Sequence, residues 1–417
     1  MKSLLALSGL LALSSAAAVA PQKVSYDGYK VFRVSVGKDV ARVKGAVDKL
    51  GLATWMGGPR ANANADVVVP PAQVDAFLAE ISGLPTVTMH EDLGASIADE
   101  SGFSTYAAGS ANDTWFNSYH SYADHLQFLK DLQSSYPSNS EIVTSGNSLN
   151  GRPITGIHFW GSSKGKPAIV FHGTVHAREW ISTMVTEYFA YYLLTNSGTS
   201  EVQGFLNKYD FYIFPVVNPD GFVYTQTSDR MWRKNRQAVS GSSCVGHDIN
   251  RNWPYQWSVS GGASTNPCDA DFKGKSQGDA PETSALSSWL QSTKKSQGIK
   301  LYIDWHSYSQ LFMTPYGYSC TALATKNTEL QSLAKGAAAA IKAVYGTSFA
   351  TGPICSTIYK ATGNSVDYTQ DVIGADYVFT AELRDKGNYG FVLPASQILP
   401  SGQEAYAGVR YLLQNMK

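Results

Sequence analysis

A histidine and a glutamate three residues apart have the spacing of a metal-binding pair. They are His176 and Glu179, in a stretch from His172 to Trp180 where an apolar strand-like run gives way to a helical pattern. Residues three apart on a helical turn share one face, so both side chains can point at one place. An imidazole and a carboxylate together suit a divalent first-row metal, and zinc most readily. The sequence therefore predicts a metal site between a strand and a helix.

A third ligand must come from elsewhere, because a catalytic zinc takes three protein ligands and keeps one open position. His306 is the best candidate, since it ends the strand-like run that begins at Leu301. Open α/β sheets place their sites at the carboxyl ends of parallel strands. His172, four residues before His176, is an alternative ligand. A His-x-x-Glu pair also arises by chance, so spacing alone leaves a purely structural role open.

A second motif, Gly161 to Gly165, matches the Gly-x-Ser-x-Gly pattern of serine hydrolases. That pattern needs a strand, a tight turn and then a helix. Here strand-like sequence lies on both sides, over 154–160 and 166–175. We therefore interpret the segment as a hairpin loop without catalytic function.

Alternating strand and helix patterns over residues 115–417 must position these side chains. Such alternation predicts an α/β domain with a mixed, mainly parallel central sheet flanked by helices. Residues 29–90 follow the order strand, helix, strand, helix, strand, with a further strand near Thr54 and Trp55. This order predicts a small ferredoxin-like open sandwich. Periodicity fades over 93–114, where we expect an exposed linker.

The first residues have the pattern of a secretory signal. Lys2 supplies one positive charge, an apolar run covers Leu4 to Leu13, and Ala16 to Ala18 fits a small-x-small cleavage site. The run is too short to span a bilayer. We expect cleavage after Ala18 and a secreted product without a membrane anchor, although a buried N-terminal helix is the alternative. Asn112 begins an N-glycosylation sequon, which such chains often leave unmodified.

Four cysteines agree with an oxidising compartment. An even number in a secreted chain favours two disulfides, for which three pairings exist. Joining sequence neighbours would pair Cys244 with Cys268 and Cys320 with Cys355. A cysteine-based zinc site is the alternative, but the chain has no Cys-x-x-Cys pair.

Composition excludes one class of partner. The 417 residues include 33 Lys plus Arg and 33 Asp plus Glu, so the formal net charge is zero. A nucleic-acid-binding protein should carry a basic excess, so we expect no such partner. Hydrophobic residues make up 43% and charged residues 16%, which favours compact domains over disorder.

Several segments, taken in order, resemble a known family. They are His176-Ala-Arg-Glu179-Trp180, Met231-Trp-Arg233-Lys-Asn-Arg236, Asp248-Ile-Asn250-Arg251-Asn-Trp253, His306-Ser-Tyr-Ser, Ile358-Tyr359 and Phe379-Thr-Ala-Glu382-Leu-Arg-Asp385. Together they are similar to the secreted zinc metallocarboxypeptidases of the carboxypeptidase A and B type. The resemblance covers the chain from about Trp115 to its C-terminus. The preceding segment resembles the activation prodomain of that family in size and element order.

The resemblance implies one zinc ion, held by His176, Glu179 and His306. Asp248 would accept a hydrogen bond from the second nitrogen of His176, as metal-bound imidazoles usually require. A simple cap or turn residue is the alternative role for Asp248.

The resemblance also implies the acid–base and electrostatic groups. Glu382 would be the general base on the metal-activated water and then the proton donor to the leaving amine. Arg233 would stabilise the developing oxyanion. The alternatives are a surface salt bridge of Glu382 with Arg384 or Lys386, and a solvated basic loop around Arg233.

Substrate-binding residues follow from the same resemblance. Arg251, with Asn250, would bind the terminal carboxylate of the substrate, because a guanidinium binds a carboxylate through two hydrogen bonds. Tyr359 would close over that carboxylate, and Arg178 would touch the substrate further along.

The pocket for the last side chain would contain Ile354 and Val366, with Gly317 near its wall. Members that remove Lys or Arg look to have an acidic residue where Val366 stands. Without that carboxylate a buried cation is unpaired and costly. The resemblance therefore implies a preference for C-terminal aromatic and large aliphatic residues.

Together these expectations describe a secreted zymogen that is a monomer. We expect a signal peptide over 1–18, an activation prodomain over 19–92, a linker over 93–114 and a catalytic domain over 115–417. An activating endoprotease would cut the linker, and the enzyme would then hydrolyse the C-terminal bond of peptides and proteins. A zinc-free binding protein should have lost a ligand or the base, and all four residues are present. An endopeptidase would more naturally show His-Glu-x-x-His, which the chain lacks.

Overall fold

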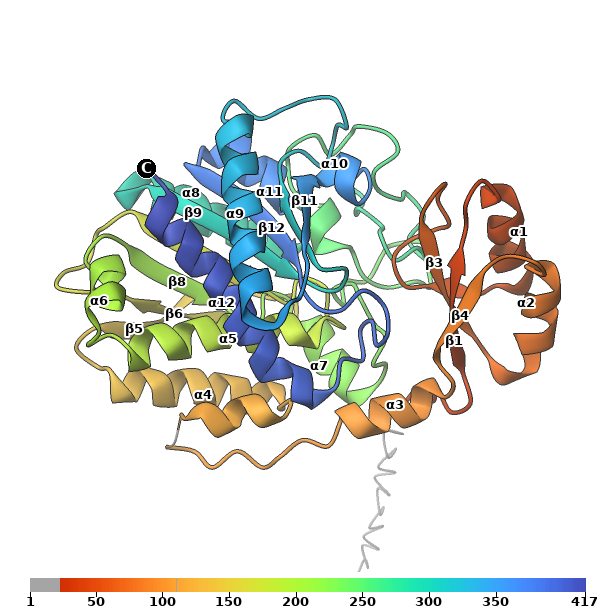
Figure 1. Cartoon of the computed structure of the whole chain (residues 1–417), viewed down its shortest axis with the longest axis horizontal. Helices are drawn as coiled ribbons and strands as arrows, with labels where there is room; N and C mark the ends of the chain where they lie inside the picture. Colours follow the sequence, from red (N-terminus) through yellow and green to blue (C-terminus); the bar gives the residue numbers. More distant parts are fainter. Residues whose placement is uncertain (1–22, 110) are drawn as a thin grey trace, which may run out of the picture.

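The computed structural model describes residues 23–109 and 111–417 (Figure 1). The expected signal peptide lies outside the described residues. Two sheets organise the rest, one of four strands and one of eight.

The N-terminal sheet is antiparallel, with the strand order β2-β3-β1-β4. Its elements are β1 (Lys30–Ser35), α1 (Val40–Leu50), β2 (Ala53–Thr54), β3 (Asn64–Val69), α2 (Val74–Glu80) and β4 (Thr86–His90). Side chains alternate across a strand, so Phe32 and Val34 of β1 pack with Val43 of α1 and Phe77 of α2. Val31 points to the other face and joins a different cluster. The ferredoxin-like prediction is confirmed.

The eight-stranded sheet has the order β11-β10-β12-β9-β7-β8-β6-β5. Its strands are β5 (Ser140–Asn147), β6 (Pro153–Phe159), β7 (Ala168–Gly173), β8 (Asp210–Phe214), β9 (Ile299–His306), β10 (Leu311–Thr314), β11 (Ala350–Pro353) and β12 (Tyr377–Glu382). The central strands β12, β9, β7 and β8 are parallel, while β5, β6 and β10 introduce antiparallel pairs. The predicted mixed, mainly parallel sheet is confirmed.

Helices cover both faces of this sheet (Figure 1). They are α4 (Tyr122–Ser135), α5 (Trp180–Thr195), α6 (Ser200–Leu206), α7 (Pro219–Thr227), α8 (Pro281–Gln297), α9 (Asn327–Tyr345), α10 (Ile354–Thr357), α11 (Ser365–Tyr368) and α12 (Ile398–Asn415). Ile169 and Phe171 of β7 pack into the core that α5, α9 and α12 share, and Val170 packs into the core beneath α8. Strands that are covered on both faces have near-continuous apolar sequences, as the central strands do.

The Gly161–Gly165 segment is not a hairpin loop, so that expectation is wrong. β6 and β7 are not neighbours, because β8 lies between them and pairs with both. Sequence adjacency of two strands does not decide pairing when a later strand can enter the sheet between them. A strand, not a helix, still follows the segment, so the catalytic elbow remains excluded.

The exposed linker expected over 93–114 begins instead with a helix, α3 (Leu93–Glu100). Asp92 caps it, since its carboxylate accepts a hydrogen bond from the Ala95 backbone N–H at 3.1 Å. Leu93, Ile97 and Glu100 are buried, at the four- and three-residue spacing of one helical face. The pattern was missed because its third buried member is a glutamate.

Both disulfides join sequence neighbours, Cys244 to Cys268 and Cys320 to Cys355. The neighbour pairing is therefore confirmed. None of the helices in the described ranges has the length and apolarity that crossing a bilayer requires.

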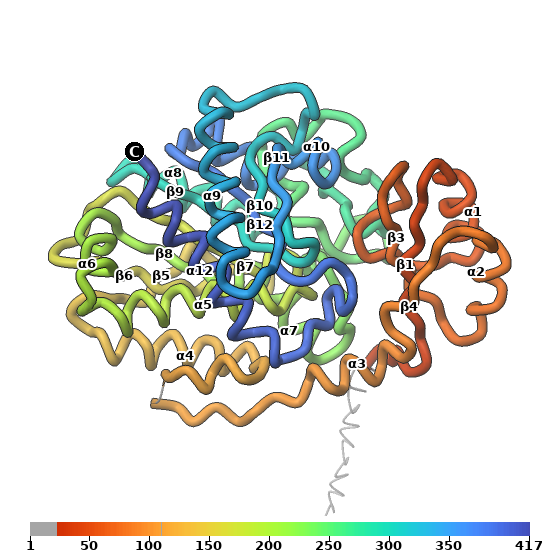
Figure 2. The backbone as a smooth tube through the Cα atoms, viewed as in Figure 1, coloured from red at the N-terminus to blue at the C-terminus, as the bar shows by residue number. Residues whose placement is uncertain are grey.

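The N-terminal sheet turns its open face to the larger domain, with α1 and α2 on the far side (Figure 2). Val31, Trp55 and Val68 form a buried cluster there with Tyr308 and Phe391 of the larger domain. Tyr308 lies two residues after the end of β9, so the interface borders the predicted metal site.

Candidate metal centre and substrate cleft

The three predicted metal ligands come from the ends of two neighbouring strands. His176 and Glu179 lie between the end of β7 and the start of α5, and His306 is the last residue of β9. β7 and β9 pair in parallel, with Gly173 opposite Trp305. Carboxyl ends of parallel strands meet at one edge of a sheet, so the fold brings these side chains together.

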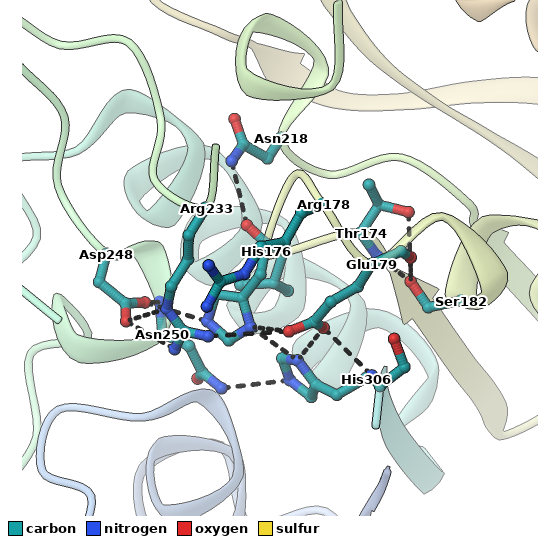
Figure 3. Close-up of polar contacts among 12 residues, drawn as sticks. Thr174, His176, Arg178, Glu179, Ser182, Asn218, Arg233, Asp248, Asn250 and His306 are labelled. Carbon is teal, nitrogen blue, oxygen red and sulfur yellow. Dashed lines mark hydrogen bonds and ion pairs between the residues drawn. The ribbon is translucent and has the colours of Figure 1, made fainter. Parts of the chain in front are cut away.

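The ligand atoms of the three side chains converge (Figure 3). His176 Nδ1 lies 2.8 Å from Glu179 Oε1, His306 Nδ1 lies 3.0 Å from Glu179 Oε2, and the two Nδ1 atoms are 3.1 Å apart. All three residues are buried. Burial alone would raise the pKa of the Glu179 carboxyl, but the adjacent imidazoles hold it below its usual range. An ionised carboxylate and two imidazoles are a donor set that fits a catalytic zinc ion.

Asp248 contacts the His176 imidazole on the side away from the other two ligands. It precedes the short helix η3 (Ile249–Arg251), and its Oδ1 lies 3.2 Å from His176 Nε2. Arg233 donates to the other oxygen, Oδ2, at 2.8 Å, and its NH1 is 3.7 Å from Glu179 Oε1. Burial would raise the pKa of Asp248, but the charge of Arg233 lowers it well below the ordinary value. Arg233 is itself mostly buried, which contradicts the solvated basic loop.

Glu382 reaches the same place from β12, whose last residue it is. In the sheet register it lies directly opposite His306. Burial raises its pKa to about 8, because the charged form is poorly solvated there. Arg384 pairs with Glu404 at 2.5 Å, so the alternative ion pair with Glu382 does not form.

One cleft unites most of the predicted site residues. It is lined by His176, His306, Glu382, Asn250, Arg251, Tyr359, Ile354 and Val366, among others. Arg251 is buried, and its Nε has no protein partner among the described residues. A buried guanidinium with a free N–H provides a site for an anion.

Gly317 and Arg178 are not among the residues that line this cleft. The backbone N–H of Gly317 donates to Asp367 at 2.9 Å. Arg178 lines a neighbouring cavity of about 380 Å³ together with Arg233. Its guanidinium donates to the Trp55 carbonyl of the N-terminal domain at 2.6 Å and lies over the ring of Phe391 at 4.1 Å.

His172, the alternative ligand, does not join the metal site. Its Nδ1 lies 3.4 Å from Asp304 Oδ1, and its Nε2 contacts the Tyr302 hydroxyl at 2.5 Å. Asp304 was not predicted, although it contacts His306 at 2.9 Å. Its position two residues before His306 on one strand was the available signal, since such residues share a face.

Comparisons with known proteins agree with this geometry. Residues 125–408 match the model of a family described as zinc carboxypeptidase, and residues 37–100 match the carboxypeptidase activation peptide. The chain belongs to the zinc carboxypeptidase family. It is a metallocarboxypeptidase A-like enzyme made with an activation peptide, and His176, Glu179 and His306 form its zinc-binding triad. The activation-peptide match extends through α3 and ends at Glu100.

Relatives of this carboxypeptidase match it over most of its length. It is 53% identical over 427 residues to the metallocarboxypeptidase A-like protein of Trichophyton verrucosum, covering 100% of both chains. It is 37% identical over 378 residues to carboxypeptidase A2 of Mus musculus, covering 89% of each. The crystal structure of thrombin activatable fibrinolysis inhibitor has a TM-score of 0.86 at 29% identity, covering 93% of this chain and 98% of that one.

Proposed function

We propose that this carboxypeptidase acts outside the cell as a monomer and removes C-terminal aromatic and large aliphatic residues from peptides and proteins. One observation carries the proposal: a single cleft is lined by both triad histidines, a partly buried glutamate, an arginine with a free N–H and apolar side chains. A free carboxylate next to the bond to be cut is what distinguishes a C-terminal residue. A cleft with a buried cation beside the metal ligands recognises that difference.

Arg251 and Asn250 bind the terminal carboxylate. The guanidinium NH1 donates to the Asn250 carbonyl at 2.8 Å, which fixes one side of the group and leaves Nε for the substrate. The Asn250 amide is itself held, because its Oδ1 accepts from the Ser365 backbone N–H at 2.9 Å. The Tyr359 ring centroid lies 5.8 Å from the Arg251 guanidinium carbon, on the same cleft wall. Tyr359 closes over the bound carboxylate.

Glu382 moves the proton. A zinc ion in the triad would supply Lewis acidity and make a water molecule more acidic. Glu382 would take one proton of the water as the water oxygen bonds to the carbonyl carbon, and would give that proton to the peptide nitrogen as the C–N bond breaks. A general acid–base group works best when its pKa lies near the working pH. Burial raises the pKa of the Glu382 carboxyl toward neutral pH, and the positive charge of a zinc ion would lower it.

Arg233 stabilises the negative charge that develops on the carbonyl oxygen. Asp248 fixes the guanidinium through Nε at 3.2 Å and NH2 at 2.8 Å. A donor that is already oriented spends no reorganisation energy when the charge appears.

The apolar end of the cleft selects the side chain. Ile354 and Val366 line it, and Asp367, the next residue, is not among the lining residues. The Asp367 carboxylate accepts hydrogen bonds from Gly317 N, Tyr318 N and Asn364 Nδ2. With that carboxylate engaged, a Lys or Arg side chain finds no counter-charge in the pocket.

The N-terminal domain keeps the uncut protein inactive. Its Arg60 lies over the Tyr359 ring at 4.6 Å, and its Trp55 carbonyl accepts a hydrogen bond from the Arg178 guanidinium. Tyr308, beside the triad, donates to Asp66 of the same domain. An endoprotease releases the domain by cutting between Ser101 and Thr114, and this stretch has no Lys or Arg, which argues against a trypsin-like enzyme.

A mass-spectrometric time course tests the activity. The activated enzyme is mixed with an unblocked peptide and with the same peptide amidated at its C-terminus. We expect stepwise loss of C-terminal residues from the free peptide only, fastest where Phe or Leu is terminal. Internal cleavage would mean an endopeptidase, and intact peptide with bound zinc would mean a binding protein.

A further inference from the structure

A line of buried polar side chains continues behind the second zinc-ligand histidine. Asp304 Oδ1 lies at ion-pair distance from two imidazoles, 2.9 Å from His306 Nε2 and 3.4 Å from His172 Nδ1, and neither contact has the angle of a formed hydrogen bond. His172 Nε2 meets the Tyr302 hydroxyl at 2.5 Å, and the Ser365 hydroxyl donates to Asp304 Oδ2 at 2.5 Å. Tyr302, Asp304, His172 and Ser365 are each 0% exposed. Burying a carboxylate is costly unless partners hold it, so its place between two imidazoles calls for a reason.

The proton on His306 supplies that reason. Nδ1 of this ring faces Glu179 and His176 and would bind the metal, so Nε2 would carry the hydrogen. Two groups contact Nε2: the Asn250 amide nitrogen at 3.2 Å and Asp304 Oδ1 at 2.9 Å. An amide nitrogen donates and cannot accept.

The amide of Asn250 cannot turn round to help, because its oxygen accepts from the Ser365 backbone N–H. Asp304 is therefore the contact of Nε2 that can accept its hydrogen. His172 completes the arrangement. When the Tyr302 hydroxyl donates to His172 Nε2, the ring hydrogen of His172 is on Nδ1, which faces Asp304.

We propose that Asp304 is a positioning residue that fixes the ring orientation and tautomer of His306 for zinc, and that His172 and Ser365 hold Asp304 in place. Each triad histidine then has its own carboxylate, Asp248 for His176 and Asp304 for His306. Such partners tune metal affinity by about 10- to 100-fold. The proposal rests on the zinc triad and is independent of the proposed substrate preference.

The test measures zinc affinity of the purified full-length protein by competition with a chromophoric chelator. For Asp304→Asn we expect a dissociation constant for zinc about 10- to 100-fold higher than in the unsubstituted protein. The rise in unfolding temperature on adding zinc should shrink accordingly, because ligand stabilisation follows affinity. For Ser365→Ala, which removes one support of Asp304, we expect a smaller rise.

Asp210→Asn is a matched control. Asp210 is 0% exposed and its Oδ2 lies 3.2 Å from His158 Nε2. It starts β8 opposite Ala168, the first residue of β7, so it sits at the opposite end of the strands from the triad. This variant should lose stability and keep its zinc affinity. Unchanged affinity in Asp304→Asn, or an equal loss in Asp210→Asn, would overturn the proposal. If Asp304→Asn does not fold, unchanged affinity in Ser365→Ala would overturn it.

Discussion

The zinc centre and the interface with the N-terminal domain lie side by side, but different interactions hold them. At the zinc centre, side chains from strand ends are fixed by buried carboxylates such as Asp248. At the interface, an apolar cluster is centred on the mutually contacting rings of Trp55, Tyr308 and Phe391. Polar contacts border it, from Arg178 to the Trp55 carbonyl and from Tyr308 to Asp66. Apolar contacts are non-directional and separate without leaving unpaired charges. The centre can therefore stay intact while the interface is lost.

The junction between the two regions carries a buried ion pair. Glu100, at the end of α3, is buried, and its carboxylate accepts hydrogen bonds from Arg230 Nε at 2.6 Å and from Arg230 NH2 at 2.8 Å. Burial raises the pKa of Glu100, although Arg230 opposes the shift. Arg230 also lies over the ring of Trp180 at 3.8 Å, in the first turn of α5. A helix held in this way stays attached to the catalytic domain, so cleavage after Glu100 need not free the N-terminal domain at once.

The largest effect should come from the zinc centre. Glu382→Gln removes the proposed proton carrier, and we expect kcat to fall by about 10²- to 10⁴-fold. In the unsubstituted enzyme, activity should decline as pH falls through the pKa of Glu382, because the base must be ionised. The pH profile of the variant should lack this decline at acidic pH. Steady-state kinetics of the activated enzyme from pH 5 to 9 measure both.

Glu404→Gln is the control for this prediction, since Glu404 is a buried glutamate that pairs with Arg384 outside the cleft. It should unfold more easily and keep its pH profile. A Glu382→Gln variant with more than a tenth of normal kcat would show that another group carries the proton.

The second largest effect should come from the interface. Trp55→Ala removes the ring that packs against both Tyr308 and Phe391, and such a loss costs about 3 kcal/mol or more in a packed site. We expect the cut N-terminal fragment to dissociate about 100-fold more readily. Activity of the cut protein on serial dilution measures this dissociation.

The control is Phe77→Leu, because Phe77 packs in the domain's own core and not at the interface. It should weaken the domain without the same gain in dissociation. Equal dilution curves for the two variants would mean that general instability, and not the interface contact, releases the fragment.

The comparison also explains how far the sequence could predict the molecule. His176, Glu179 and His306 could be found because metal chemistry restricts residue type and strand ends restrict position. Asp304 was missed, because its one signal in the sequence is its spacing of two residues from His306. Its contact with His172 of the neighbouring strand appears only in the fold. α3 was missed because Glu100 becomes a core residue only through Arg230, which is 130 residues away. Partners distant in sequence decided both cases.

A smaller change should redirect the pocket. Val366→Asp puts a carboxylate where the pocket is apolar, so we expect kcat/KM for a C-terminal Phe to fall about 10- to 50-fold and hydrolysis of a C-terminal Lys to become measurable. The Asn side chain of Val366→Asn is similar in size to Asp but uncharged. This variant should lose activity on C-terminal Phe without gaining activity on C-terminal Lys. Paired dipeptide substrates ending in Phe and Lys measure the ratio. A gain of Lys activity in the Asn variant would assign the effect to pocket size instead of charge.

The smallest effect should come from the contact that joins the two regions, Arg60 over Tyr359. A cation–π contact at a partly exposed site contributes about 0.5–1 kcal/mol, so Arg60→Ala should raise the residual activity of the uncut protein only about two- to fivefold. Arg42→Ala is the control, because Arg42 donates to the Glu80 and Ser82 carbonyls of its own domain. A blocked dipeptide assay on the uncut proteins compares them. If Arg60→Ala raised activity as much as complete cleavage does, the aromatic interface would be secondary and this one contact would be the inhibitory element.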